Sequence, residues 1–143
     1  MATMPIEFRM LSVRQPHSWA ICSGHKDVEN RTWRFPYEMP CTIGVQAGVR
    51  IDPDGLDAPV DVPDDLPRGC ALGVVVVISD HDSSECLKPD GTLCSPWAVP
   101  GHRHWVLAHA RTLDHPIPCR GLLKLFRPPQ DVAEALARLS QAR

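Results

Sequence analysis

Prolines are the feature that most limits the fold of this chain, because fifteen of them are spread over 143 residues. A proline removes a backbone hydrogen-bond donor and disrupts the interior of a helix or of a central strand. The sequence therefore predicts many turns and few long helices. The length suits one domain that buries a core of its own, and we predict a single domain over residues 1–143.

Short apolar segments between the turns predict a mainly β protein. The strongest segment, residues 70–79, contains five consecutive β-branched residues and is typical of the centre of a sheet. Further strands are expected at residues 8–13, 27–33, 41–47, 104–113 and 122–127. With a short helix after the first strand and a C-terminal helix, the pattern predicts an α+β, mainly β fold, a small and partly closed barrel of about six strands.

The two helices and the connecting segments have their own signals. A helix over residues 16–23 should begin at Pro16 and end at Gly24, and Asp131 is a suitable N-cap for a helix over residues 131–142. Residues 116–121 are expected to form a corner. Residues 48–69 and 83–103 are expected to be long surface loops, the first an ordered loop or a helical turn.

Polar residues gather around the predicted short helix. Arg14, Gln15 and His17 lie at its start, where free backbone N–H groups favour an anion. In the following strand, alternation places Glu29 and Arg31 on one face. A plain surface ion pair would account for these charges. The alternative is a polar groove in which Arg31 positions Glu29.

Charge is distributed unevenly along the chain. Residues 1–50 carry six basic and four acidic side chains, residues 51–100 carry two and ten, and residues 101–143 carry seven and three. A basic face can bind phosphates even on a protein whose net charge is −2. The charges could also scatter over the folded surface, so that charge alone does not decide the function.

The cysteines and histidines do not follow a regular metal-binding pattern. Six cysteines are scattered without a C-x-x-C pair. The nearest zinc-type set is Cys86, Cys94, His102 and His104. A second group, at the end of the strongest strand, lacks a fourth ligand with convincing spacing and consists of Asp80, His81 and Asp82. We therefore expect reduced thiols, no bound metal and no cofactor.

No segment has the composition of a membrane span or of a secretion signal. The longest apolar run, residues 71–78, fits one strand. The N-terminal ten residues lack a basic stretch followed by an apolar one. The expectation is a cytoplasmic protein without membrane association.

Two motifs resemble the ASCH domain, a family of the PUA-like superfamily. They are L-S-V-R-Q-P at residues 11–16 and G-H-K-D-V-E-N-R-T-W at residues 24–33, against family patterns of roughly L-S-x-x-Q-P-W and G-x-K-x-x-E-x-R-x-W. The resemblance continues over nearly the whole chain, through residues 69–80, 105–107 and 116–121. His17 departs from the family, which often has tryptophan there.

The resemblance implies a PUA-like β-barrel whose cleft binds nucleic acid, with RNA favoured, or a modified nucleoside. Arginine and lysine suit phosphate, aromatic rings can stack a base, and amide or carboxylate groups can bind its edge. Trp97 is a further candidate for stacking. The residues assigned to this site are Ser12, Arg14, Gln15, Pro16, His17, Lys26, Glu29, Asn30, Arg31 and Trp33.

A small hydrolase is the alternative, and a plain interaction domain with an exposed apolar patch is a third class. Some small ASCH proteins hydrolyse N4-acetylcytidine with a lysine, a threonine three residues later and a distant glutamate. Lys26 matches the lysine, but Glu29 occupies the threonine position. The Lys26–Glu29 pair could serve an amidohydrolase or a ribonuclease by acid–base chemistry. Candidates for the distant acid are Asp80, Asp82 and Glu85.

Overall fold

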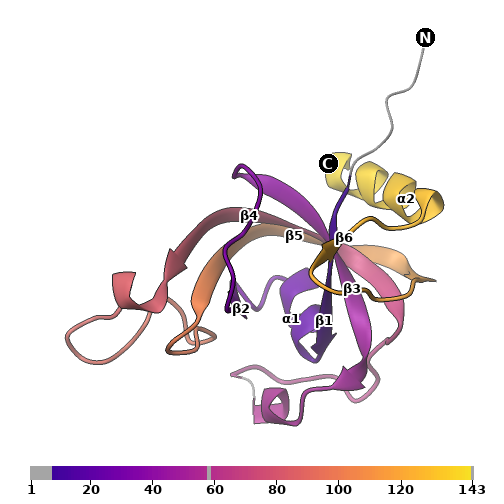
Figure 1. The fold of residues 1–143 in the computed structure, drawn as a ribbon. Helices are drawn as coiled ribbons and strands as arrows, with labels where there is room; N and C mark the ends of the chain where they lie inside the picture. Colours follow the sequence, from indigo (N-terminus) through magenta and orange to yellow (C-terminus); the bar gives the residue numbers. More distant parts are fainter. Residues whose placement is uncertain (1–7, 58, 143) are drawn as a thin grey trace.

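The computed structural model describes residues 8–57 and 59–142, which form a six-stranded mixed sheet with two helices (Figure 1). The strands are β1 (Met10–Gln15), β2 (Val28–Arg31), β3 (Cys41–Ile51), β4 (Cys70–Asp82), β5 (Arg103–Pro118) and β6 (Leu125–Phe126). The helices are α1 (His17–Cys22) and α2 (Gln130–Gln141), with 3₁₀ turns η1 (Pro53–Asp57) and η2 (Ser83–Glu85). The predicted α+β, mainly β class is confirmed. Of the ten N-terminal residues on which the expected lack of a secretion signal depends, residues 1–7 lie outside the described part of the chain.

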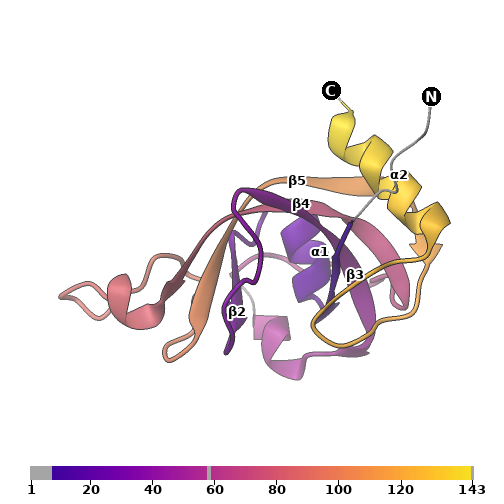
Figure 2. The same ribbon diagram turned by 45° about the horizontal axis from the view of Figure 1, so that its top comes forward.

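The sheet has the strand order β2-β5-β4-β3-β1-β6 and curls strongly (Figures 1 and 2). Neighbouring strands are antiparallel except β1 and β3, which are parallel. Within the described residues β2 and β6 are the two edges and do not pair, so the sheet is not closed. A PUA-like barrel is therefore not confirmed. The curl nevertheless brings β2 close to β1, since Arg31 donates to the Ser12 carbonyl at 3.1 Å.

Both faces of β4 are covered, which explains its continuous apolar sequence. On the concave side, where α1 lies (Figure 2), Val75 and Val77 belong to one buried cluster with Ile21. On the other side, Val74 belongs to a second cluster with Leu136 of α2. A strand with water on one face would alternate apolar and polar residues instead.

Gln15 fixes the position of α1 at the end of β1. Its side chain is fully buried, and its Oε1 accepts a hydrogen bond from the Trp19 N–H at 2.9 Å. Its Nε2 donates to the Pro67 carbonyl at 2.8 Å. The helix ends where it was predicted to end, because Gly24 follows with a φ of +84°, a conformation that glycine adopts without strain.

Two local predictions are wrong. Residues 116–121 are not a corner, because β5 continues to Pro118, which pairs with Cys70 of β4. β2 pairs only with the start of β5, from Arg103 to Val106. Pro116 and Pro118 lie outside this paired segment, where a missing N–H toward β2 breaks no hydrogen bond between the two strands. Asp131 is not the N-cap of α2, because that position is Pro129 and Asp131 lies in the first turn.

Within residues 8–57 and 59–142, no helix is long and apolar enough to cross a membrane.

Gly73 should be intolerant of a side chain. A Cβ at this position would lie 2.1 Å from the Arg111 carbonyl oxygen of β5. Gly73→Ala should lower the free energy of unfolding by about 2 kcal/mol, a typical cost of overpacking. Gly48→Ala is the matched control, because its Cβ would meet no atom closer than 3.7 Å. Urea unfolding followed by tryptophan fluorescence measures both, and equal stability of the two variants would contradict this account of the β4–β5 packing.

Candidate functional site

A cavity of about 460 Å³ opens between β1, β2, the start of α1 and the loop that follows η2. Eight of the ten predicted site residues line it, and Gln15 and Pro16 do not. These eight are Ser12, Arg14, His17, Lys26, Glu29, Asn30, Arg31 and Trp33. The remaining lining residues are Val13, Thr32, Asp52, Trp97, Val99 and His102. The two motifs, which are separate in the sequence, therefore meet at one concave surface.

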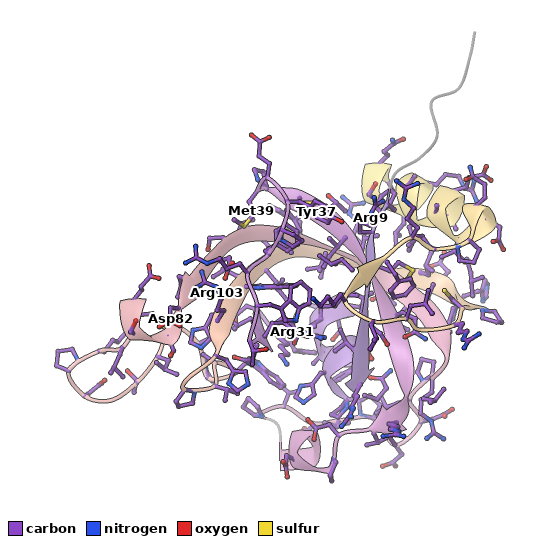
Figure 3. All side chains as sticks on the ribbon, in the orientation of Figure 1. Arg9, Arg31, Tyr37, Met39, Asp82 and Arg103 are labelled. Carbon is purple, nitrogen blue, oxygen red and sulfur yellow. The ribbon has the colours of Figure 1, made fainter. Side chains whose placement is uncertain are left out.

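The carboxylate of Glu29 lies between two cations at the base of this cavity. Lys26 Nζ is 3.4 Å from Oε1, and Arg31 donates to Oε2 from Nε at 3.1 Å and from Nη2 at 2.8 Å. Lys26 is 4% exposed and Glu29 is 5% exposed. Arg31, labelled in Figure 3, also reaches the Ser12 carbonyl and so joins β2 to β1. The predicted role of Arg31 in positioning Glu29 matches this geometry.

His17 extends the network to a carboxylate that the sequence did not single out. Its Nδ1 lies 2.9 Å from Lys26 Nζ, and its Nε2 lies 2.9 Å from Asp52 Oδ2. An ammonium group can only donate, so His17 Nδ1 is the acceptor. The His17 proton then sits on Nε2, where Asp52 accepts it. The result is a continuous chain of polar contacts from Asp52 through His17, Lys26 and Glu29 to Arg31.

The pKa directions agree with this arrangement. Burial raises the pKa of Glu29, but the charges of Lys26 and Arg31 outweigh it and leave the pKa below its ordinary value. Burial and then the charge of Lys26 lower the pKa of His17. Burial raises the pKa of Asp52, but the hydrogen bond from His17 and the charge of Arg14 contribute to a net lowering. Near neutral pH, Glu29 and Asp52 are thus carboxylates and His17 is a neutral imidazole.

Three predicted binding groups are already used inside the protein. Both ends of the Gln15 amide bond the backbone, so Gln15 does not offer an edge to a ligand. The same contact occupies the Trp19 N–H, one of the donors expected at the start of α1. Asn30 lines the cavity, but its Nδ2 donates to the Trp97 carbonyl at 2.9 Å and its Oδ1 accepts from the Val99 N–H at 2.8 Å.

Asn30 instead positions the aromatic side of the cavity. Its two bonds hold the segment that carries Trp97, whose indole Nε1–H donates to the His25 carbonyl at 3.0 Å. Lys26 Nζ lies 5.5 Å from the centroid of the Trp97 ring, and the ring of His17 meets it edge-on at 6.2 Å. Trp33 is a second aromatic residue of the lining. Trp97, considered from the sequence as a stacking residue, thus lines the same cavity as Trp33.

None of the three acids considered as a distant partner lies in this cavity. Asp80 accepts from Arg103 Nε at 3.0 Å and from the Phe35 N–H at 2.9 Å. Asp82 and Glu85 cap η2, each accepting a backbone N–H. The acid that does line the cavity besides Glu29 is Asp52, which lies just after β3 and was not among the candidates. The strand was predicted to end at residue 47, and Asp52 was therefore assigned to an acidic surface loop.

A second cavity of about 880 Å³ adjoins the first and shares Ser12, Arg14 and Arg31 with it. Arg120 and Lys124 add two cations, and none of the described residues that line it is acidic. Its remaining lining residues are Gln46, Gly48, Val49, Gly69, Cys119, Gly121, Leu122 and Leu123. Of these, Leu122 and Leu123 are 52% and 91% exposed. The two cavities together make a groove that is mixed in charge at one end and basic at the other.

A separate group of metal-type ligands lies outside the groove. It consists of His81, Cys86, Cys94 and His104. The set considered from the sequence contained His102 in place of His81. The β4–β5 register pairs His81 directly with His104, whereas His102 precedes β5 and lines the first cavity. All six cysteines are free thiols.

No protein-family model matches the chain, and a search of curated proteins finds no match.

Removing the charge of Glu29 should destabilise the protein. Glu29→Gln leaves Lys26 and Arg31 without their countercharge in a buried site, and should lower the free energy of unfolding at pH 7 by about 3 kcal/mol. Because the folded-state pKa of Glu29 is lowered, its contribution is complete above its ordinary pKa of about 4.3 and is lost as the pH falls through the folded-state value. The difference between wild type and variant should therefore narrow in acid.

Urea unfolding at a series of pH values measures this difference. The matched control is Glu38→Gln, an exposed glutamate for which a change within about 0.5 kcal/mol is expected. Equal effects of the two substitutions at pH 7, or a difference that widens in acid, would contradict the assignment.

Proposed function

We propose that this chain is a nucleic-acid-binding module that takes an unpaired nucleobase in the first cavity and the adjoining phosphates along the second. RNA is the favoured ligand. The observation that carries the proposal is the continuity of the two cavities through Arg14 and Arg31, which places a basic channel beside a partly aromatic, polar pocket. A single nucleotide combines a flat base with a charged backbone and matches this division.

The first cavity has the size and chemistry for a base. Small-molecule sites in proteins commonly enclose about 300–1,000 Å³ and combine aromatic walls with a few polar groups. Trp97 and Trp33 supply the aromatic surface, and Thr32 and Lys26 supply polar groups. Stacking of a base on an aromatic side chain contributes about 1–3 kcal/mol and tolerates any sequence.

The second cavity supplies the electrostatic part. Arg14 and Arg120 are exposed lining residues of this cavity, and the charge of Arg14 also acts on Asp52. Arginines in such positions can bind phosphate in a bidentate manner. A base must leave its stack to enter a cavity, so single strands, loops and bulges are the expected form of the ligand.

The resemblance to the ASCH domain supports the same proposal. Most residues of the two motifs that carry the resemblance line the first cavity. The Q-P pair does not, but it places α1 beside the cavity through the bonds of Gln15. Under this proposal the motif residues serve one site, either directly or by holding its walls.

Single-stranded RNA should bind with an affinity that falls as salt rises. Arg14→Ala and Arg120→Ala should each reduce the log–log salt slope by roughly 0.7, the effect of one lost phosphate contact on a single strand. Arg138→Ala is the matched control, because Arg138 is exposed on α2 and lines neither cavity. Fluorescence anisotropy with labelled RNA and DNA oligonucleotides at several salt concentrations measures the slopes. Absence of binding to every oligonucleotide would overturn the proposal.

Loss of the aromatic wall should weaken binding without changing its salt dependence. Trp97→Ala should reduce the affinity about tenfold, within the range expected for one stacked base. The matched control is Trp19→Ala, because Trp19 lies on α1 and is not a lining residue of either cavity. An unchanged affinity of the Trp97 variant in the same assay would contradict the placement of a base in the first cavity.

A hydrolase remains the second candidate, because Lys26 is buried and held between His17 and Glu29. The proposed reaction adds water to the acetyl carbonyl carbon of N4-acetylcytidine and breaks the bond to the exocyclic nitrogen, which takes up a proton. The products are acetate and cytidine. Lys26 and Glu29 would accept the proton from the attacking water and donate a proton to the exocyclic nitrogen.

Incubation of the protein with N4-acetylcytidine, followed by chromatography, tests the second candidate. Lys26→Met should abolish product formation while circular dichroism reports a folded protein. Activity that persists in this variant would exclude Lys26 as the acid–base group, and absence of activity in the wild type would leave binding as the function.

A further inference from the structure

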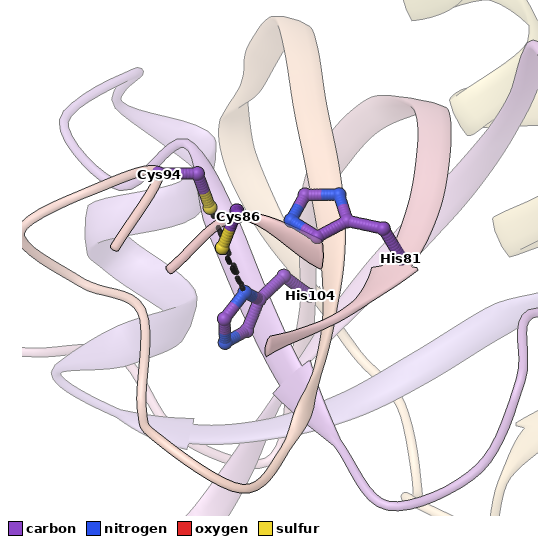
Figure 4. Close-up of side chains that lie close together, drawn as sticks. All are labelled: His81, Cys86, Cys94 and His104. Atoms are coloured by element: carbon purple, nitrogen blue, oxygen red, sulfur yellow. Dashed lines mark hydrogen bonds between the residues drawn. The ribbon is translucent and has the colours of Figure 1, made fainter. Parts of the chain in front are cut away.

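Four side chains with zinc-ligand chemistry converge where the end of β4 pairs with the start of β5 (Figure 4). We propose that His81, Cys86, Cys94 and His104 bind one structural Zn²⁺, which fastens the loop of residues 83–102 to the sheet. This proposal is independent of the proposed function.

The distances fit a tetrahedral ion. The four candidate ligand atoms all lie within 4.8 Å of one another. His104 Nδ1 lies 3.4 Å from Cys86 Sγ and 3.6 Å from Cys94 Sγ. Zinc bonds of about 2.3 Å to sulfur and about 2.0–2.1 Å to nitrogen give a tetrahedron with edges of about 3.3–3.8 Å. A small contraction of the group is sufficient to bind the ion.

His104 is oriented as a metal ligand. It is fully buried, and its Nε2 lies 2.9 Å from the Val99 carbonyl. A carbonyl can only accept, so the proton sits on Nε2 and the lone pair of Nδ1 points toward the two sulfurs. Metal-binding histidines nearly always donate their second ring N–H to a carbonyl or a carboxylate in this manner.

His81 supplies the observation that a plain packing role does not explain. Its Nε2 is buried and has no hydrogen-bond partner among the described residues. In Figure 4 the ring of His81 faces the side of the cluster where Cys86 and His104 lie. A buried ring nitrogen without a partner is costly, and coordination to a metal would satisfy it.

The register of the sheet explains why the spacing in the sequence is irregular. His81 and His104 are direct partners in the antiparallel β4–β5 pair, so their side chains share one face. Cys86 follows η2, and Cys94 returns from the tip of the loop. The ligands are thus assembled by strand pairing and one loop, and not by the two short knuckles that a C-x-x-C pattern indicates.

Two cysteine and two histidine ligands favour zinc, and four protein ligands leave no open position for a substrate. The ion would therefore have a structural role and not a catalytic one. The loop that it fastens carries Trp97, Val99 and His102, three lining residues of the first cavity. It is long and contains few buried side chains, Ser95 being one.

Metal analysis of the purified wild-type chain tests the proposal. We expect one zinc ion per chain that survives gel filtration with a weak competing chelator. Cys86→Ser and Cys94→Ser should lose the ion. Cys41→Ser should keep it, because Cys41 is a half-buried free thiol outside the cluster. Wild-type protein without zinc, or equal zinc in all three variants, would overturn the proposal.

Cobalt substitution keeps the test decisive if the cysteine variants do not fold. Titration of the zinc-free wild type with Co²⁺ should give the intense visible bands of a tetrahedral site together with sulfur-to-cobalt charge transfer. Weak bands typical of octahedral Co²⁺, or no charge transfer, would overturn the proposal. Neither measurement depends on whether the groove binds RNA.

Discussion

The candidate site depends on one buried carboxylate. Glu29 lies away from water, where an isolated charge would be strongly unfavourable, and Lys26 and Arg31 compensate it from two sides. Arg31 also bonds the Ser12 carbonyl, so the same ion network crosses the gap between β2 and β1 that the sheet leaves open. The groove exists because this gap is joined by polar side chains and not by strand pairing.

The network also determines what the cavity presents to a ligand. Lys26 contacts Glu29, the neutral ring of His17 and the face of Trp97, so its ammonium group is held in place. His17 is in turn held by Asp52. Fixed donors beside an aromatic wall can recognise a flat polar ligand at a low entropic cost. Arg14, Arg120 and Lys124 line the second cavity and can add electrostatic attraction for an anionic ligand.

Features that depend on neighbours in the sequence were predictable. Alternation in β2 placed Glu29 and Arg31 together, and the stop at Gly24 follows from backbone sterics. Features that depend on long-range register were not. Asp52 reaches His17 only because β3 is longer than its apolar pattern, and His81 meets His104 through a β4–β5 pairing that contains several register shifts.

Amides were the least predictable groups. Gln15 and Asn30 are suitable in type for a base edge, but each bonds backbone atoms far away in the sequence. Nothing in a local pattern distinguishes an amide that binds a ligand from one that holds a loop. The site residues proposed from the two motifs therefore divide into groups that face the cavity and groups that support it.

The proposed function requires the first cavity to hold a base, and the four tryptophans are natural probes of this cavity. An NMR titration of the indole Nε1–H signals with single-stranded RNA is the most direct test. We expect the signals of Trp97 and Trp33 to shift most, and those of Trp19 and Trp105, which are not lining residues of the cavity, to shift less. Shifts led by Trp19, or no shift at Trp97 when RNA is bound, would contradict it.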